Sequence, residues 1–250
     1  MKRSGGPPGI NLPGSLLPRF SMMKSVLWVL LSLIIFAGFT LTKPDDSKSK
    51  DTTPSDAGIR RVIDTHRQSW EGMNVPEVDG KALHDIVLQH GYKNALEIGT
   101  SNGFSGLWIA WALSKTGGKL TTVEINRERH EEALGYFRDA DLAKFIDARL
   151  GDAHQLVPAL PGPFDFVFCD ADKDWYENYL KAVLPKITVG GCFAAHNVFD
   201  YSGGRGGFRR NYGGMTGGYL EFAKSLENLE TGVLSLPGSG GLAVSYKKAK

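Results

Sequence analysis

Acidic and basic side chains crowd one short segment of the sequence, residues 170–174, which read Asp-Ala-Asp-Lys-Asp. The segment directly follows the apolar run Phe164–Cys169, so we expect it to lie at the tip of a buried strand. Carboxylates beside a lysine suit a hard divalent cation with an adjacent general base, here Asp170 and Lys173. A solvated acidic loop would have the same composition, and that alternative stays open.

A second polar pair, His196 and Asn197, follows the apolar run 192–195. An imidazole nitrogen and an amide oxygen at a neighbouring strand end would complete a metal site with Asp170. Magnesium prefers oxygen ligands, whereas imidazole suits manganese, iron, cobalt or zinc, so we expect activity to favour a transition metal over magnesium. The alternative is that His196 makes only a structural or substrate hydrogen bond and that no metal is needed.

A glycine-rich loop follows the run Asn94–Ile98, with glycines at 99, 103 and 106. Glycines let the backbone approach a bound small molecule, and open parallel sheets bind ligands at the carboxyl ends of their strands. The spacing Gly-x-x-x-Gly-x-x-Gly departs from the Gly-x-Gly-x-x-Gly of dinucleotide enzymes. Glu97 would repel a pyrophosphate and attract an ammonium or sulfonium group. A glycine-rich turn with an incidental glutamate is the alternative.

Two further segments suit a nucleoside. Glu124 ends a predicted strand beyond the glycine loop, where a carboxylate accepts hydrogen bonds from vicinal ribose hydroxyls. Asp152 could accept from an exocyclic amine of adenine, and Ala153 leaves room for a flat ring. Each carboxylate has a simpler explanation as a charge or cap at a helix N-terminus.

The elements that must position these residues alternate between helix and strand, which predicts an α/β fold with a mostly parallel sheet. Helices are expected at 59–70, 81–90, 107–113, 127–140, 176–184 and 219–227. Strands are expected at 94–98, 120–124, 145–150, 164–169, 192–195, 232–236 and 242–246. Turns are expected at 71–80, 151–154 and 185–191.

The N-terminal part differs in composition. Residues 1–25 are rich in Gly and Pro with scattered basic residues and are expected to be disordered. The apolar run 26–41 is typical of a signal peptide or an uncleaved membrane anchor, which predicts an exported or membrane-anchored protein. A cytoplasmic location is the alternative if the start of translation is misassigned. Residues 42–58 are expected to form a flexible linker to a domain at 59–250.

Length and composition set the remaining bounds. The chain of 250 residues is long enough for one catalytic domain with appendages. A formal net charge of +2 gives no strong electrostatic attraction to nucleic acid, so nucleic acid is not an expected partner. The two cysteines, Cys169 and Cys192, lie in apolar runs and are predicted to be buried thiols.

From about residue 72 onward, the chain resembles the cation-dependent O-methyltransferases of the catechol and caffeoyl-coenzyme A type. Four motifs carry the resemblance in order: Met73-Asn-Val75 with Gly80, Leu96-Glu-Ile-Gly99 through Ser105, Val123-Glu124, and Phe-Val-Phe-Cys-Asp at 166–170 with Lys173. The resemblance implies a Rossmann-like class I methyltransferase with helices on both faces of a seven-stranded sheet, whose last strand is antiparallel.

The resemblance also implies roles for individual residues. Contacts to S-adenosylmethionine would come from Met73, Val75, Glu97, Gly99, Ser101, Ser105, Glu124, Asp152, Ala153 and Asp170. Asp170 and Asn197 would bind a divalent metal, and Lys173 would be the base. The family typically has Asp-Asn where this chain has His196-Asn197, so both the metal and the need for one stay open.

The predicted function is therefore O-methylation of a small hydroxylated acceptor, for which a catechol-like diol is one candidate. Residues 203–210 read Gly-Gly-Arg-Gly-Gly-Phe-Arg-Arg and are interpreted as part of a lid, an RNA-binding segment or a solvated loop. A nicotinamide-dependent oxidoreductase and a membrane-tethered S-adenosylmethionine-binding protein without turnover are the competing hypotheses. A homodimer is an open possibility.

Overall fold

A computed structural model describes residues 53–70, 74–198 and 213–249, with the side chains of 213–217 excepted. Contacts within the chain separate residues 1–50 from residues 51–250, and all described residues belong to the second unit. The predicted disordered segment 1–25 and the predicted signal or anchor 26–41 lie outside the described residues. Within the described ranges, no helix is both long and apolar enough to cross a membrane.

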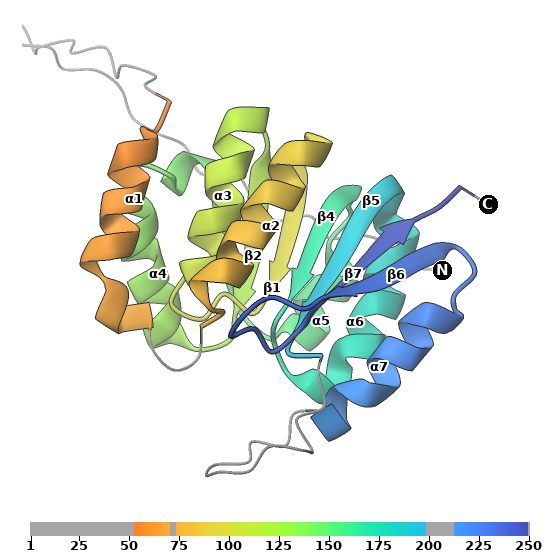
Figure 1. Ribbon diagram of the computed structural model, residues 1–250. Coiled ribbons are helices and arrows are strands. Elements are labelled where there is room, and N and C mark those ends of the chain that lie inside the picture. The colour runs from red at the N-terminus through yellow and green to blue at the C-terminus, as the bar shows by residue number, and fades with distance from the viewer. Residues whose placement is uncertain (1–52, 71–73, 199–212, 250) are drawn as a thin grey trace, which may run out of the picture. The chain divides into compact units, whose positions relative to one another are not determined.

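Helices and strands alternate along most of the unit (Figure 1). The α-helices are α1 (Asp56–Thr65), α2 (Glu77–His90), α3 (Phe104–Thr116), α4 (Arg127–Asp139), α5 (Ala153–Ala159), α6 (Tyr176–Val183) and α7 (Gly213–Ser225). The strands are β1 (Asn94–Ile98), β2 (Lys119–Glu124), β3 (Ile146–Leu150), β4 (Phe164–Cys169), β5 (Ile187–His196), β6 (Leu229–Leu234) and β7 (Leu242–Lys247). Short 3₁₀ turns are η1 (Arg67–Trp70), η2 (Ala143–Phe145), η3 (Lys173–Trp175) and η4 (Leu184–Lys186).

The seven strands form one sheet in the order β3-β2-β1-β4-β5-β7-β6. Strands β1 to β5 pair in parallel, and β7 runs antiparallel to both β5 and β6. The predicted fold class, including the antiparallel last strand, is confirmed. The strand order reverses between β1 and β4, and crevices form at the carboxyl ends of strands at such a switch point.

Two apolar layers cover the sheet. On one face, α1 to α4 pack against side chains such as Ala95 of β1 and Phe168 of β4. On the other face, α5 to α7 pack against the alternate residues, such as Leu96 and Cys169. Because successive side chains of a strand point to opposite faces, these hydrophobic strands are buried on both sides. Cys169 and Cys192 are buried free thiols, as predicted.

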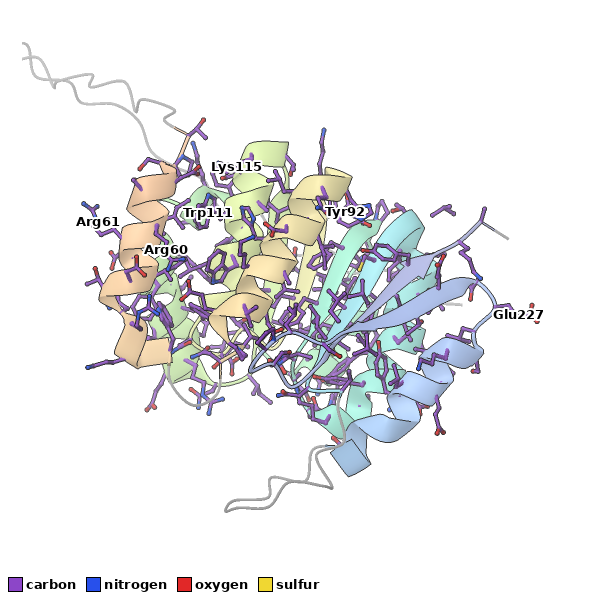
Figure 2. The ribbon with its side chains drawn as sticks, viewed as in Figure 1. Arg60, Arg61, Tyr92, Trp111, Lys115 and Glu227 are labelled. Carbon is purple, nitrogen blue, oxygen red and sulfur yellow. The ribbon has the colours of Figure 1, made fainter. Side chains whose placement is uncertain are left out.

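The domain begins before the predicted linker ends. Ser55 caps α1 by accepting a hydrogen bond from the amide of Gly58. Asp56 accepts hydrogen bonds from Trp111 over 2.7 Å and from Lys115 over 2.6 Å. Both donors project from α3 toward α1 (Figure 2). The end of segment 42–58 is therefore helical and tied to the domain.

Three predicted turns contain regular structure instead. Helix α2 begins at Glu77, directly after Pro76, and α5 begins at Ala153 after the cap Asp152. Between 185 and 191, η4 leads into β5, which starts at Ile187. Gly190 adopts φ of 80° within this strand, so the glycine pair produces an irregularity and no chain reversal. Helix α7 also begins earlier than predicted, at Gly213.

Candidate active site

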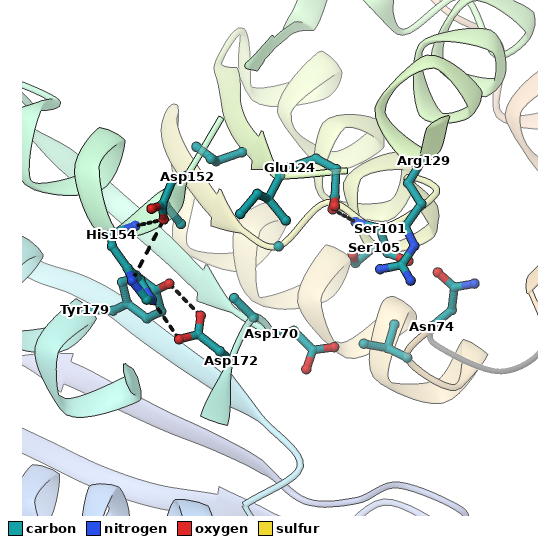
Figure 3. A pocket seen from close by; sticks show the side chains of 16 residues that line it. Asn74, Ser101, Ser105, Glu124, Arg129, Asp152, His154, Asp170, Asp172 and Tyr179 are labelled. Atoms are coloured by element: carbon teal, nitrogen blue, oxygen red, sulfur yellow. Dashed lines mark hydrogen bonds and ion pairs between the residues drawn. The ribbon is translucent and has the colours of Figure 1, made fainter. Parts of the chain in front are cut away.

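A cavity of about 520 Å³ opens at the carboxyl ends of β1, β2 and β4 (Figure 3). Eight of the residues expected to contact a cofactor line it: Val75, Gly99, Ser101, Ser105, Glu124, Asp152, Ala153 and Asp170. Met73 lies outside the described residues. The switch point of the sheet thus brings together side chains from five separate segments of the chain.

Gly99 makes the floor of the cavity possible. Its φ is 95°, and a Cβ atom at this position would lie 2.8 Å from the carbonyl oxygen of Asp170. The loop after β1 therefore packs directly on the backbone at the end of β4, which only glycine permits. This contact places Ser101 and Asp170 around one cavity.

Glu124 anchors the next loop. Its Oε2 accepts a hydrogen bond of 2.7 Å from the amide of Ser101, and its Oε1 accepts one of 2.9 Å from the amide of Asn126. The side chain is almost fully buried at the cavity wall. Each carboxylate oxygen can accept a second hydrogen bond, so Glu124 is fixed in place and still able to receive two ligand hydroxyls.

Glu97 differs from its predicted role, because it is fully buried and does not line the cavity. Ser105 donates to its Oε1 and Thr122 to its Oε2, each over 2.6 Å. Burial raises the pKa of Glu97 to about 7, although both hydroxyls favour the charged form. Glu97 therefore positions Ser105 from behind, and Ser105 is the group that faces the cavity.

The opposite end of the cavity carries a polar cluster around Asp172. Asp152 accepts a hydrogen bond of 2.8 Å from the amide of His154, so it both caps α5 and lines the cavity. The ring of His154 stacks on Trp175 at 3.6 Å between centroids, and its Nε2 lies 2.8 Å from Asp172. Tyr179 donates to Asp172 over 2.6 Å. Sequence reasoning missed His154 and Tyr179, which carry no motif of their own.

Asp170 is the charged centre of the cavity. Lys173 donates to its Oδ1, and His196 Nδ1 lies 3.2 Å from its Oδ2. Burial alone would raise the pKa of Asp170, but the positive charges of Lys173 and His196 outweigh it and lower that pKa below its ordinary range. Lys173 also donates to the hydroxyl of Tyr176 over 2.5 Å. Lys173 lies beneath Asp170 and is absent from the cavity lining.

Asp79 of α2 is a partner that the sequence did not reveal. It is fully buried, and its Oδ2 lies 3.0 Å from Nε2 of His196. Burial alone would lower the pKa of His196, but Asp170 and Asp79 together raise it to about 9. One signal was present in the sequence: Asp79 stands on the same helical stripe as the buried residues Leu83 and Ile86.

Two of the predicted metal ligands, Asp170 and His196, are engaged by protein groups. Within 53–70, 74–198 and 213–249, no group of three or more His, Cys, Asp or Glu side chains could hold a metal ion. Both nitrogens of His196 and both oxygens of Asp170 already bond to protein groups. Asn197, the third predicted ligand, has φ of 58° and lies against the backbone of Gly240.

Comparison with solved structures defines the class of the fold. An O-methyltransferase from Bacillus cereus, in complex with SAH, superposes with a TM-score of 0.65 and 24% identity, covering 78% of this chain and 92% of that chain. The O-methyltransferase TomG from Streptomyces achromogenes, in complex with SAM, superposes with a TM-score of 0.66 and 23% identity. That superposition covers 78% of this chain and 91% of TomG. The fold is that of the class I S-adenosylmethionine-dependent methyltransferases.

Sequence comparison narrows this class to a family. A family model described as O-methyltransferase matches residues 47–203, and the chain belongs to that family. Caffeoyl-CoA O-methyltransferase 1 of Eucalyptus globulus is 36% identical over 139 residues, which is 54% of this chain and 56% of that protein. The caffeoyl-CoA O-methyltransferase of Zinnia elegans is 35% identical over 146 residues, which is 56% of this chain and 58% of that protein. The matches thus span little more than half the length of these curated relatives.

Proposed function

We propose that this protein transfers a methyl group from S-adenosylmethionine to a hydroxyl oxygen of a small acceptor. The observation that carries the proposal is that Glu124 and Asp170 line the same cavity of about 520 Å³, at the ends of two different strands. Glu124 is a preformed acceptor for vicinal hydroxyls, and Asp170 is an ionised carboxylate at the other strand end. A ligand with a ribose and a positively charged tail matches both groups.

The chain's side chains suggest how the donor is held. Glu124 would receive the ribose hydroxyls, and Asp152, Ala153 and the cluster around Asp172 would surround the adenine. Ser101, Ser105 and Asp170 would hold the amino-acid end, where the carboxylate of Asp170 attracts an ammonium or sulfonium charge. When bound there, S-adenosylmethionine supplies an electrophilic methyl group that needs only alignment with an attacking oxygen.

Asp170 is also the group best placed to meet the acceptor hydroxyl. It lines the cavity, whereas Lys173 reaches the cavity only through its bond to Asp170. Lys173 would therefore hold Asp170 ionised and oriented, and Asp170 would take up the proton that the acceptor hydroxyl loses when its oxygen is methylated. This arrangement replaces the predicted direct proton removal by Lys173. A catechol-like diol remains one acceptor to test.

The experiment is an acceptor screen with methyl-labelled S-adenosylmethionine and the purified full chain. The set should contain a catechol, a monophenol, an aliphatic alcohol and an amine, with the site of methylation determined by mass spectrometry. We expect label on oxygen of at least one phenolic acceptor. Label on nitrogen alone, or tighter calorimetric binding of NAD than of S-adenosylmethionine, would contradict the proposal.

A further inference from the structure

A buried row of polar side chains connects α2 to the floor of the cavity. It runs from Asp79 through His196 and Asp170 to Lys173, with contacts of 3.0 Å and 3.2 Å at the two histidine nitrogens. Asp79 is fully buried, and the side chains of His196, Lys173 and Asp170 are 3%, 9% and 15% exposed. Asp79 and His196 are therefore shielded from water, whereas Asp170 also faces the cavity.

The contacts of His196 leave no electron pair for a metal. A carboxylate that is ionised only accepts hydrogen bonds, so a ring nitrogen facing it must donate. Both nitrogens of His196 face carboxylates, Asp170 at Nδ1 and Asp79 at Nε2. A nitrogen that carries a proton cannot coordinate a cation, because a ligating histidine must offer a free lone pair.

Asp79 cannot easily release His196. Its Oδ1 is buried with no hydrogen-bond partner among the residues that the structure describes, so His196 is the group that compensates its carboxylate. The next residue, Gly80, lies so close to α3 that a Cβ there would be 2.4 Å from Cδ1 of Trp108. Helix α2 is thus held against α3, and moving Asp79 away would leave a buried charge unpaired.

Resting on the proposed function, we propose that the row of Asp79, His196, Asp170 and Lys173 takes the place of a divalent cation, so that methyl transfer in this protein requires none. His196 and Lys173 each donate to one oxygen of Asp170 and so supply, beside this carboxylate, the positive charge that a cation would supply. Asp79 is the positioning residue of this arrangement, since it fixes the His196 ring from behind. A metal site is disfavoured because both ring nitrogens of His196 donate hydrogen bonds to carboxylates and so cannot coordinate a cation.

The test is a titration of the full chain with Mn²⁺ after exhaustive chelation. Binding is measured as the loss of the electron paramagnetic resonance signal of free Mn²⁺. For the wild type, we expect no saturable loss of signal at Mn²⁺ up to about 1 mM, the weak limit of protein sites for hard cations. Methyl transfer should be unchanged by the chelator. One-to-one Mn²⁺ binding below about 0.1 mM, or activity lost on chelation and restored by a cation, would overturn the proposal.

Two variants sharpen the result. His196→Asp offers oxygen donors beside Asp170, and we expect it to gain saturable Mn²⁺ binding. Failure of folded His196→Asp to bind Mn²⁺ would overturn the assignment of His196 as the group that displaces the cation. Asp79→Asn should lower kcat about tenfold to hundredfold with the KM for S-adenosylmethionine unchanged, because misplacing a reacting group affects the chemical step. The control Asp85→Asn, on the same helix with a side chain 41% exposed, should match the wild type.

Failure of the proposed O-methyltransferase function can be distinguished from failure of the proposal that no cation is required. If the function fails, S-adenosylmethionine would not bind, or no acceptor would be methylated under any condition. The Mn²⁺ titration of the wild type still answers the question of the cation, because its readout needs neither donor nor acceptor. It also answers that question if either variant does not fold.

Discussion

Asp79 and His196 are 117 positions apart in the sequence, yet Oδ2 of the first lies 3.0 Å from Nε2 of the second in the buried interior. Helix α2 and the end of β5 are joined by this contact. The pair explains how a histidine side chain is accommodated in the buried interior at the end of β5.

This pair should show strong energetic coupling. Removing one partner leaves the other buried and uncompensated, so Asp79→Ala and His196→Ala should each lower the free energy of unfolding by about 3 to 5 kcal/mol. The double variant should be more stable than the sum predicts, with a coupling of about 1 to 3 kcal/mol. Urea unfolding of the wild type, the two single variants and the double variant measures this coupling. Losses of unfolding free energy that simply add would show that the contact is unimportant.

Glu97 should make stability fall as the pH rises. Its pKa is raised from an ordinary 4.5 to about 7, so between these values the folded protein retains a proton that the unfolded chain has lost. Stability from this group is full below pH 4.5, declines up to pH 7 and is then constant. Glu97→Gln should therefore gain about 3 kcal/mol relative to the wild type between pH 4.5 and pH 8. A constant difference between the two ligand-free proteins over this range would contradict the prediction.

Gly99→Ala should disrupt the cavity. The added methyl group meets the carbonyl of Asp170 at 2.8 Å and the backbone has a positive φ, so we expect a loss of stability of about 1 to 3 kcal/mol and weaker donor binding. Gly135→Ala is the matched control, because no atom other than those of its chain neighbours and its own helix backbone lies within 4 Å of the new methyl group. In the interior of α4, that change should stabilise by about 0.5 to 1 kcal/mol. Equal effects of the two substitutions in thermal unfolding would refute the argument from close packing.

Glu124→Ala should weaken binding of S-adenosylmethionine by about 1 to 3 kcal/mol, since it removes the acceptor for the ribose and leaves the amides of Ser101 and Asn126 unpaired. Isothermal titration calorimetry is the measurement. Glu128→Ala, exposed in the first turn of α4, serves as the control and should bind like the wild type. An unchanged affinity in Glu124→Ala would place the ribose elsewhere.

Much of the fold could be predicted because the central strands β1 and β4 are short, largely apolar runs with clear ends. The carboxyl ends of parallel strands lie at one edge of a sheet, so the sequence was enough to group Gly99, Glu124, Asp152 and Asp170. The full length of β5 could not be predicted, because Gly190 and Gly191 are typical of a turn. Pairing with β4 on both sides of these glycines, at Ile187 and at 192–195, keeps the segment within the strand despite that local preference.

The polar partners were harder to predict than the ligand-facing residues. Asp79 has no motif, and its role depends on a histidine from a distant strand. Glu97 belongs to a motif, but the sequence does not show that Ser105 and Thr122 would enclose it. Long-range contacts of this kind follow from tertiary packing, which a single sequence pattern does not specify.

The central claim is O-methyl transfer from S-adenosylmethionine in the cavity between Glu124 and Asp170. Its most direct test is a single-turnover measurement with the full chain, labelled S-adenosylmethionine and a phenolic acceptor, in which the released thioether and the methylated product are both quantified. We predict one O-methylated product for each thioether formed, and a large loss of rate in Asp170→Asn even at concentrations of S-adenosylmethionine that saturate the variant. Bound donor that is never consumed with any hydroxylated acceptor would contradict the claim.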